Sequence, residues 1–158
     1  MNIFKNTDSL SLTATLDKST IDLVLTDPPY IISHETGFKS VKDGVQRFAV
    51  ETEFGDWDKP ENFSLGALED SIKEYYRVLR AGGTAIIFCD IWKISQIKEI
   101  LERNKFKQIR LIDWIKTNPV PLNSSRNYLT NSREVALSAV KVSKPTFNSK
   151  YDNGLYRY

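Results

Sequence analysis

Apolar residues recur along this 158-residue chain in an order that alternates strand-like and helix-like segments. Residues 21–26 form a short, nearly continuous apolar run, which is typical of a strand buried on both faces. Residues 65–79 show apolar side chains at helical spacing, and residues 84–89 follow as the next apolar run. The pattern therefore predicts a strand, a helix and a second strand, in an α/β order.

Polar and glycine residues mark where the predicted helices begin and end. Asn62 or Ser64 is available to cap the first helix, and Gly82 is expected to terminate it. A second apolar stripe predicts a helix that ends near Asn104. Residues 108–116 and 134–141 are rich in β-forming residues with only a loop between them, so we expect an antiparallel pair.

Charge is nearly balanced, since 22 basic and 20 acidic residues give a net charge of +2. The balance alone does not indicate a nucleic-acid-binding protein, but basic residues predominate after residue 104. One cysteine and one histidine exclude an intrachain disulfide and disfavour a zinc site, so no metal is expected and Cys89 is interpreted as a small buried residue. No signal peptide or membrane-spanning run is recognised, and the cytoplasm is the expected compartment.

Three segments lack clear periodicity and are candidates for contacts outside the core. Residues 31–60 are long enough to form a lid or a DNA-facing loop, and residues 117–133 form a second loop rich in Asn, Ser and Pro. Residues 142–158 are interpreted as the start of a target-recognition or linker segment. The basic residues that we expect to contact DNA phosphates are Lys39, Lys42, Arg47, Lys116, Arg126 and Arg133.

The tetrapeptide Asp27-Pro28-Pro29-Tyr30 directly follows the apolar run 21–26. An exocyclic amine on a base is a poor nucleophile because its lone pair is delocalised into the ring. The Asp27 carboxylate and the Pro28 carbonyl could each accept one N–H and leave the lone pair aimed at a methyl donor. Tyr30 offers a ring for stacking, which is worth about 1–3 kcal/mol per base. These residues are the candidate catalytic site for a base extruded from a duplex.

The sequence resembles the amino-methylating DNA methyltransferases, which act on the N6 of adenine or the N4 of cytosine. The motifs that carry the resemblance are Asp27-Pro28-Pro29-Tyr30 and, further along, 54–58, 76–83, 84–90, 114–119 and 133–137. Their order is that of the permuted beta class, in which the catalytic region precedes the cofactor region. The resemblance implies S-adenosylmethionine as cofactor, with Asp8 near its adenosine and Asp27 beside the transferred methyl group. It also implies double-stranded DNA as substrate and a restriction-modification setting.

The family resemblance further implies a partial Rossmann-like α/β methyltransferase fold, with a mixed sheet and an antiparallel C-terminal strand pair. We expect residues 1–158 to form one catalytic region. One family motif is missing, because no two of the seven glycines are separated by one residue, as the cofactor-binding Gly-x-Gly loop requires. The chain therefore resembles the catalytic portion of such an enzyme without most of its cofactor-binding portion.

Several alternatives stay open at the level of sequence. Aspartate at position 27 favours adenine over cytosine by the resemblance, and N4-cytosine remains the other target. The chain could instead be an inactive DNA-binding remnant, or one half of a split enzyme whose second polypeptide supplies the cofactor-binding half. RNA or a protein amide would also fit a pocket for a planar amine, and a homodimer stays open because an unpaired sheet edge favours association.

Overall fold

The structure, a computed structural model, describes residues 4–30, 38–42, 45–50, 64–117, 132–142 and 144–147. The chain divides into two compact units. The first unit contains Met1–Pro28 and Glu69–Tyr158, and the second contains Pro29–Leu68.

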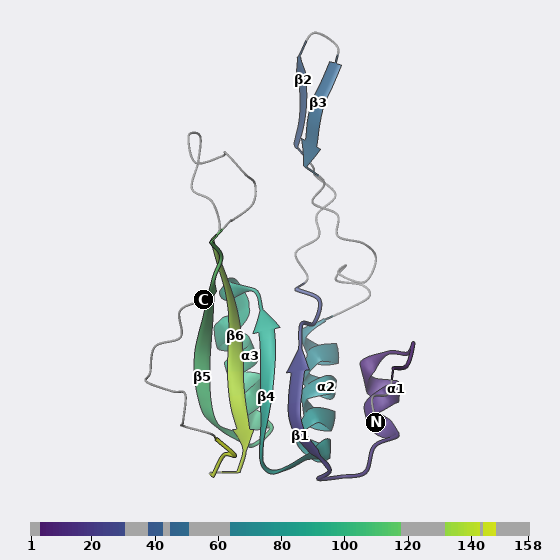
Figure 1. Ribbon diagram of the computed structural model, residues 1–158, viewed down its shortest axis with the longest axis vertical. Helices are drawn as coiled ribbons and strands as arrows, with labels where there is room; N and C mark the ends of the chain where they lie inside the picture. The colour runs from purple at the N-terminus through teal and green to yellow at the C-terminus, as the bar shows by residue number, and fades with distance from the viewer. Residues whose placement is uncertain are drawn as a thin grey trace. The chain divides into compact units, whose positions relative to one another are not determined.

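A four-stranded sheet forms the centre of the first unit (Figure 1). Its strands are β1 (Ile21–Thr26), β4 (Leu79–Cys89), β6 (Arg133–Lys141) and β5 (Phe106–Ile115), in the order β1-β4-β6-β5. β1 and β4 are parallel, whereas β6 runs antiparallel to both β4 and β5. The predicted mixed sheet with an antiparallel C-terminal pair is confirmed.

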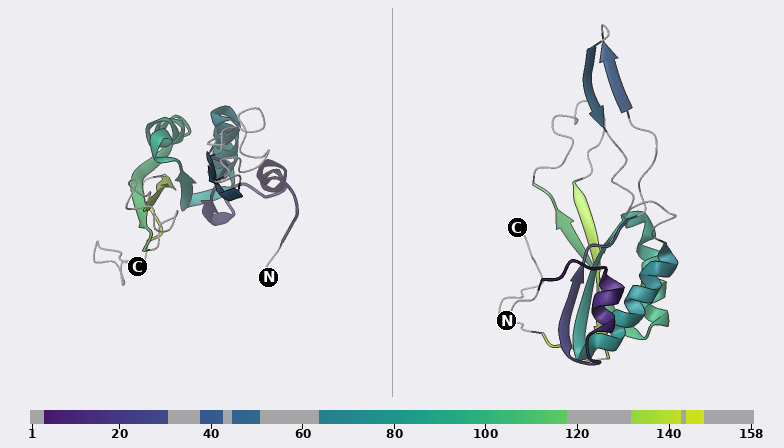
Figure 2. Two further views of the ribbon diagram at one scale, coloured as in Figure 1. Left: turned by 90° about the horizontal axis from the view of Figure 1, so that it is seen from above. Right: turned by 90° about the vertical axis from the view of Figure 1, so that its right-hand side faces the viewer.

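Two amphipathic helices, α2 (Leu65–Val78) and α3 (Ile94–Arg103), cover one face of the sheet (Figure 2). The Ser64 hydroxyl accepts from the Ala67 N–H at 3.2 Å and so caps α2, as predicted. The side chains buried between helices and sheet include Ile72, Leu79, Ile87, Leu101 and Phe106. In the described part of the chain, no helix is long and apolar enough to cross a membrane.

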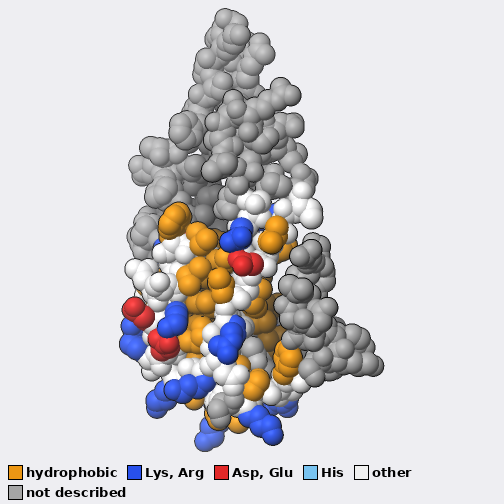
Figure 3. Space-filling model, turned by 90° about the vertical axis from the view of Figure 1, so that its left-hand side faces the viewer, with side chains coloured by type: hydrophobic (Ala, Val, Ile, Leu, Met, Phe, Trp, Pro, Cys, Tyr) orange, Lys and Arg blue, Asp and Glu red, His pale blue; other side chains and the backbone are white. Residues whose placement is uncertain are grey.

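The expectation that residues 21–26 are buried on both faces is wrong. β1 is an edge strand of the described sheet, with β4 as its one neighbour there. Leu23 and Leu25 are 51% and 63% exposed. At the opposite edge, β5 also exposes apolar side chains, and hydrophobic groups gather on the side of the molecule seen in Figure 3. An apolar run indicated the strand correctly, but it did not reveal the strand's position in the sheet.

Gly82-Gly83 does not terminate α2, because the helix ends at Val78 and β4 begins at Leu79. Both glycines lie within β4, where the register with β1 shifts: Ile21 pairs with Leu79 but Leu23 with Thr84. Gly82 has a φ of +80°, and a Cβ there would lie 2.6 Å from the Lys144 carbonyl oxygen. Glycine is therefore required by this irregularity of the strand rather than by a helix stop.

One helix and one hairpin of the structure were not predicted from the sequence. The short helix α1 (Ser9–Ala14) follows Asp8, which is the N-cap of this helix. In the second unit, β2 (Phe38–Lys42) and β3 (Val45–Val50) form an antiparallel hairpin within the expected loop 31–60. The signal for the hairpin was present, since Asp43-Gly44 is a favoured two-residue turn sequence.

Candidate functional site

Asp27 and Pro28 follow β1 at the edge of the sheet where β1 and β4 both end. The two strands run parallel, with Thr26 beside Ile87, so their carboxyl ends meet at this edge. Asp27 is exposed, while Pro28, Pro29 and Tyr30 are half-buried. The candidate catalytic turn is therefore not sealed inside the core, and the Asp27 carboxylate is open to a ligand.

The same edge of the sheet carries an acidic and an aromatic residue after β4. Asp90 caps the 3-10 turn η2 (Ile91–Lys93), and its Oδ1 accepts from the Trp92 N–H at 3.1 Å. Trp92 is 88% exposed, although sequence reasoning did not single it out. Ligands of open α/β sheets bind outside the carboxyl ends of the strands, so Trp92 lies at the edge where a ligand is expected, but one exposed ring is not by itself a binding surface.

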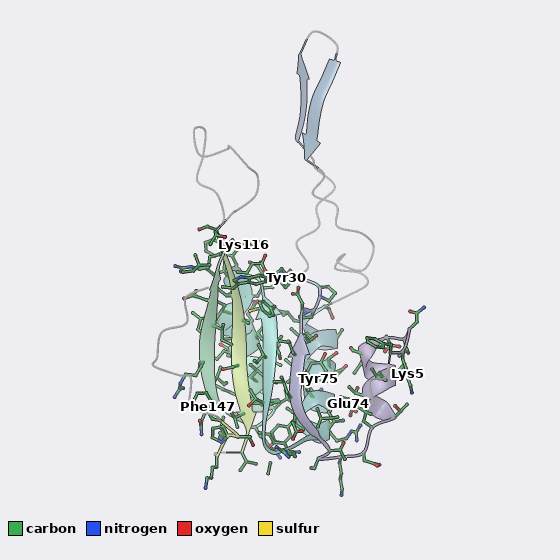
Figure 4. The ribbon with its side chains drawn as sticks, viewed as in Figure 1. Lys5, Tyr30, Glu74, Tyr75, Lys116 and Phe147 are labelled. Carbon is green, nitrogen blue, oxygen red and sulfur yellow. The ribbon has the colours of Figure 1, made fainter. Side chains whose placement is uncertain are left out.

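Lys116 and Arg133, two of the predicted DNA contacts, lie at this edge as well. The ladder aligns Cys89 with Val135, and Trp114 with Glu134, which places the end of β5 and the start of β6 beside the end of β4. Figure 4 shows Lys116 at this end of the sheet. Lys116 forms an ion pair with Glu134, and Arg133 Nε lies 3.5 Å from Asp113 Oδ1. Both cations thus already have acidic neighbours.

The side chains of the other predicted DNA contacts are not among the described parts of the structure. Lys39 and Lys42 belong to β2 and Arg47 to β3, but the structure describes only the backbone there. Arg126 lies outside the described residues. Their contact with DNA stays a prediction.

The segment around Asp8 lines an open cavity of about 480 Å³ on the first unit, although Asp8 itself is not one of the lining residues. The residues that line the cavity are Lys5, Asn6, Thr7, Ser11, Leu12 and Thr15. The Asp8 Oδ1 accepts from the Ser11 N–H at 2.8 Å, and this hydrogen bonding lowers the pKa of the Asp8 carboxyl from its usual value. Asp8 is thus a charged N-cap within the segment that lines this open hollow.

Cys89 is buried at the end of β4, as expected from the sequence. Burial raises the pKa of its thiol to about 11, because the thiolate would lose its hydration there. The thiol is therefore protonated at neutral pH, and its place between sheet and helices is that of a packing residue.

The family model described as DNA methylase, for N6 and N4 methyltransferases, matches residues 21–156. The type II methyltransferase M2.LlaDCHI of Lactococcus lactis subsp. cremoris is 32% identical over 160 residues, which cover 99% of this chain and 54% of that protein. M2.DpnII of Streptococcus pneumoniae is 32% identical over 146 residues, covering 90% of this chain and 52% of that protein. The chain spans about half the length of these curated relatives.

Solved structures match over nearly the whole chain. The M1.HpyAVI complex with SAM has a TM-score of 0.60 and 25% identity, and the match covers 96% of this chain and 59% of that one. The PvuII DNA methyltransferase, described as cytosine-N4-specific, also has a TM-score of 0.60, at 15% identity and with 88% and 49% coverage. The mixed α/β sheet thus corresponds to part of the methyltransferase fold.

Proposed function

Because this chain belongs to the N6/N4 amino DNA methyltransferase family, we propose that it acts in transferring a methyl group from S-adenosylmethionine to the exocyclic amine of adenine in double-stranded DNA. The observation that carries the proposal is Asp27-Pro28-Pro29-Tyr30 after the carboxyl end of β1, with the Asp27 side chain exposed. Type II relatives support a restriction-modification setting.

In the proposed mechanism, Asp27 and Pro28 orient the target amine. The Asp27 carboxylate and the Pro28 carbonyl each accept one N–H, so that the nitrogen lone pair leaves the plane of the ring. The cofactor supplies an electrophilic methyl group. The nitrogen gains a bond to carbon, the bond from that carbon to sulfur breaks, and the nitrogen releases one proton, for which the exposed Asp27 gives a path to water.

Tyr30 is proposed to hold the extruded base by stacking. Tyr30→Ala should raise the KM for duplex DNA by about fivefold to a hundredfold, because stacking is worth about 1–3 kcal/mol. Tyr30→Phe and Tyr30→Trp retain an aromatic face and should stay within about threefold of the parent chain. Steady-state kinetics on one duplex measures the effect, and a Tyr30→Phe variant as impaired as Tyr30→Ala would rule out stacking.

For the cofactor, Asp8 and the cavity beside it are the proposed adenosine site. The residues fit a nucleoside, since the lining contains hydroxyl, amide and ammonium groups together with the apolar Leu12. Asp8 lies in sequence between the lining residues Thr7 and Ser11, and its carboxylate, which already accepts from the Ser11 N–H, is proposed to accept from a ribose hydroxyl as well. The structure of M1.HpyAVI in complex with SAM, whose match covers 96% of this chain, supports a cofactor of this class.

Double-stranded DNA is proposed to lie across the carboxyl-end edge of the sheet. Lys116 and Arg133 stand at this edge, and phosphate contacts there would have to compete with Glu134 and Asp113. Lys39, Lys42, Arg47 and Arg126 complete the proposed phosphate-binding set.

A second candidate is that the chain acts as one part of a two-part methyltransferase. The observation that favours it is the edge strand β1, on which Leu23 and Leu25 are exposed. Parallel sheets normally have both faces covered, and an unpaired edge is open to pairing with another chain, so a further element is expected there. The proposed occupant is an α/β polypeptide equivalent to the portion of M2.LlaDCHI for which this chain has no counterpart.

One assay distinguishes these candidates. The purified chain, alone or with that remaining portion of M2.LlaDCHI, is incubated with labelled S-adenosylmethionine and duplex DNA, and the nucleosides are then separated. Labelled N6-methyladenine from the chain alone supports the complete enzyme. Label that requires the added portion, and is lost in Leu25→Lys, supports the two-part enzyme. Labelled N4-methylcytosine would contradict the adenine assignment. If neither mixture incorporated label, the chain would be an inactive remnant and both candidates would be wrong.

A further inference from the structure

The helix α1 lacks the attachment that usually holds a helix in place. None of its six residues is buried, so apolar packing contributes little to its position. The hydroxyls of Thr13 and Thr15 bond to carbonyls within the helix itself and so do not link it to the rest of the unit. Yet α1, its C-cap Thr15 and the residues before the helix line the cavity in the segment around Asp8.

Arg77, on α2, supplies that attachment. Its Nη2 donates to the Thr13 carbonyl at 2.8 Å and its Nη1 to the Leu16 carbonyl at 3.0 Å. The Thr13 carbonyl lies in the last turn of α1 and also accepts from the Leu16 N–H at 2.9 Å, while Leu16 itself directly follows the C-cap Thr15. Carbonyls at a helix C-terminus can accept from a side-chain donor in this way. The planar guanidinium can reach two separate carbonyls at once, which a lysine ammonium on its flexible stem does less well.

Glu74 fixes the direction of the Arg77 side chain. Its Oε2 accepts from Arg77 Nε at 2.9 Å and lies 2.8 Å from Nη2. Figure 4 shows Glu74 on the side of α2 that is turned toward α1. Because both side chains are only about one-third exposed, at 35% and 29%, this pair is less screened than an ordinary surface ion pair.

The residues that Arg77 holds alternate with residues that line the cavity. Leu12 and Thr15 contribute to the lining, and Arg77 binds the carbonyls of Thr13 and Leu16, the residues directly after them. A shift of these carbonyls would therefore move the cavity wall directly.

We propose that Arg77, oriented by Glu74, is a positioning residue for the adenosine site: it fixes α1 against α2 and thereby sets the shape of the cavity beside Asp8. This inference rests on the proposed function, since it takes the cavity to bind the adenosine part of S-adenosylmethionine. Arg77 does not touch the cofactor in this scheme and acts only through α1.

The unit should fold without the Arg77 side chain. The Ser19 N–H donates to the Arg77 carbonyl at 3.0 Å and the Thr20 N–H to the Val78 carbonyl at 2.9 Å, and these backbone bonds survive any substitution at position 77. Lys141 Nζ also binds the Leu79 carbonyl at 2.6 Å and stabilises the same corner. Loss of Arg77 should thus loosen α1 alone.

The test compares Arg77→Met and Arg77→Lys with Arg103→Met in the full chain. Arg103 is a matched control because it also binds a glutamate of α2, Glu69, at 3.0 Å, but from α3 rather than across to α1. Amide exchange should quicken at Leu12, Thr15 and Leu16 in Arg77→Met, less in Arg77→Lys, and not in Arg103→Met. The Kd for adenosine and for S-adenosylmethionine, measured by calorimetry, should rise about tenfold in Arg77→Met, be partly restored in Arg77→Lys, and stay unchanged in Arg103→Met.

The possible failures are distinguishable. If the parent chain binds both ligands and Arg77→Met binds them equally well, Arg77 does not position the site and the inference is wrong, while the proposed function stands. If α1 exchange does not change, the clamp itself is refuted. If the parent chain binds neither adenosine nor S-adenosylmethionine, the assignment of the cavity to the cofactor fails together with the inference.

Discussion

Methyl transfer will fall by about a hundredfold or more when Asp27 is replaced by alanine or asparagine. Alanine removes one of the two acceptors that orient the amine, and the asparagine amide can turn a donor toward a group that itself donates. The loss should appear in kcat rather than in the KM for the cofactor, because Asp27 acts on the lone pair in the reacting geometry. Single-turnover transfer of labelled methyl groups measures the loss. It is carried out with the chain alone or with the chain and the added portion of M2.LlaDCHI, according to which of the two is active.

The controls for Asp27 concern folding. Asp27 is exposed, so neither replacement should lower the melting temperature by more than about 2 °C. Glu99→Gln removes another exposed carboxylate of the same unit, on α3, and should leave transfer unchanged. If Asp27→Asn lost stability in proportion to its loss of activity, Asp27 would be a structural residue and the catalytic assignment would be abandoned.

Much of the first unit follows from local patterns in the sequence. Ser64 and Asn104 mark the ends of α2 and α3 because caps and helical spacing are local signals. The antiparallel pairing of β5 and β6 follows from the absence of a helical pattern between them. The candidate catalytic turn could likewise be found from four consecutive residues, since its chemistry depends on their types and on the strand before them.

The features that the sequence did not reveal depend on contacts between distant segments. Whether the side chains of β1 are buried on both faces depends on which distant segments cover the two faces of the sheet, and Leu25 is exposed in the structure. The role of Arg77 depends on carbonyls more than sixty positions away in the chain. The helix α1 was missed for a different reason, since six residues are too few to establish a helical period.

Replacing Gly82 and Gly66 by alanine should change the free energy of unfolding in opposite directions. At Gly82, with its φ of +80°, a Cβ would lie 2.6 Å from the Lys144 carbonyl oxygen, so either the backbone shifts or the clash remains. We expect Gly82→Ala to lower the free energy of unfolding by about 2–4 kcal/mol, combining left-handed strain with displacement of the segment after β6. At Gly66 the nearest atom is the Ser64 Oγ, at 3.5 Å, which is ordinary contact.

Gly66 lies within α2, so Gly66→Ala should raise the free energy of unfolding by about 0.5 kcal/mol through helix propensity. Urea unfolding of both variants measures the two effects. The dependence of the free energy of unfolding on urea concentration should be the same in both variants and in the parent chain. The Thr146 N–H donates to the Gly82 carbonyl at 3.0 Å, so faster amide exchange at Thr146 should accompany Gly82→Ala. A neutral Gly82→Ala would show that this bulge can relax, and that the register shift between β1 and β4 does not depend on glycine.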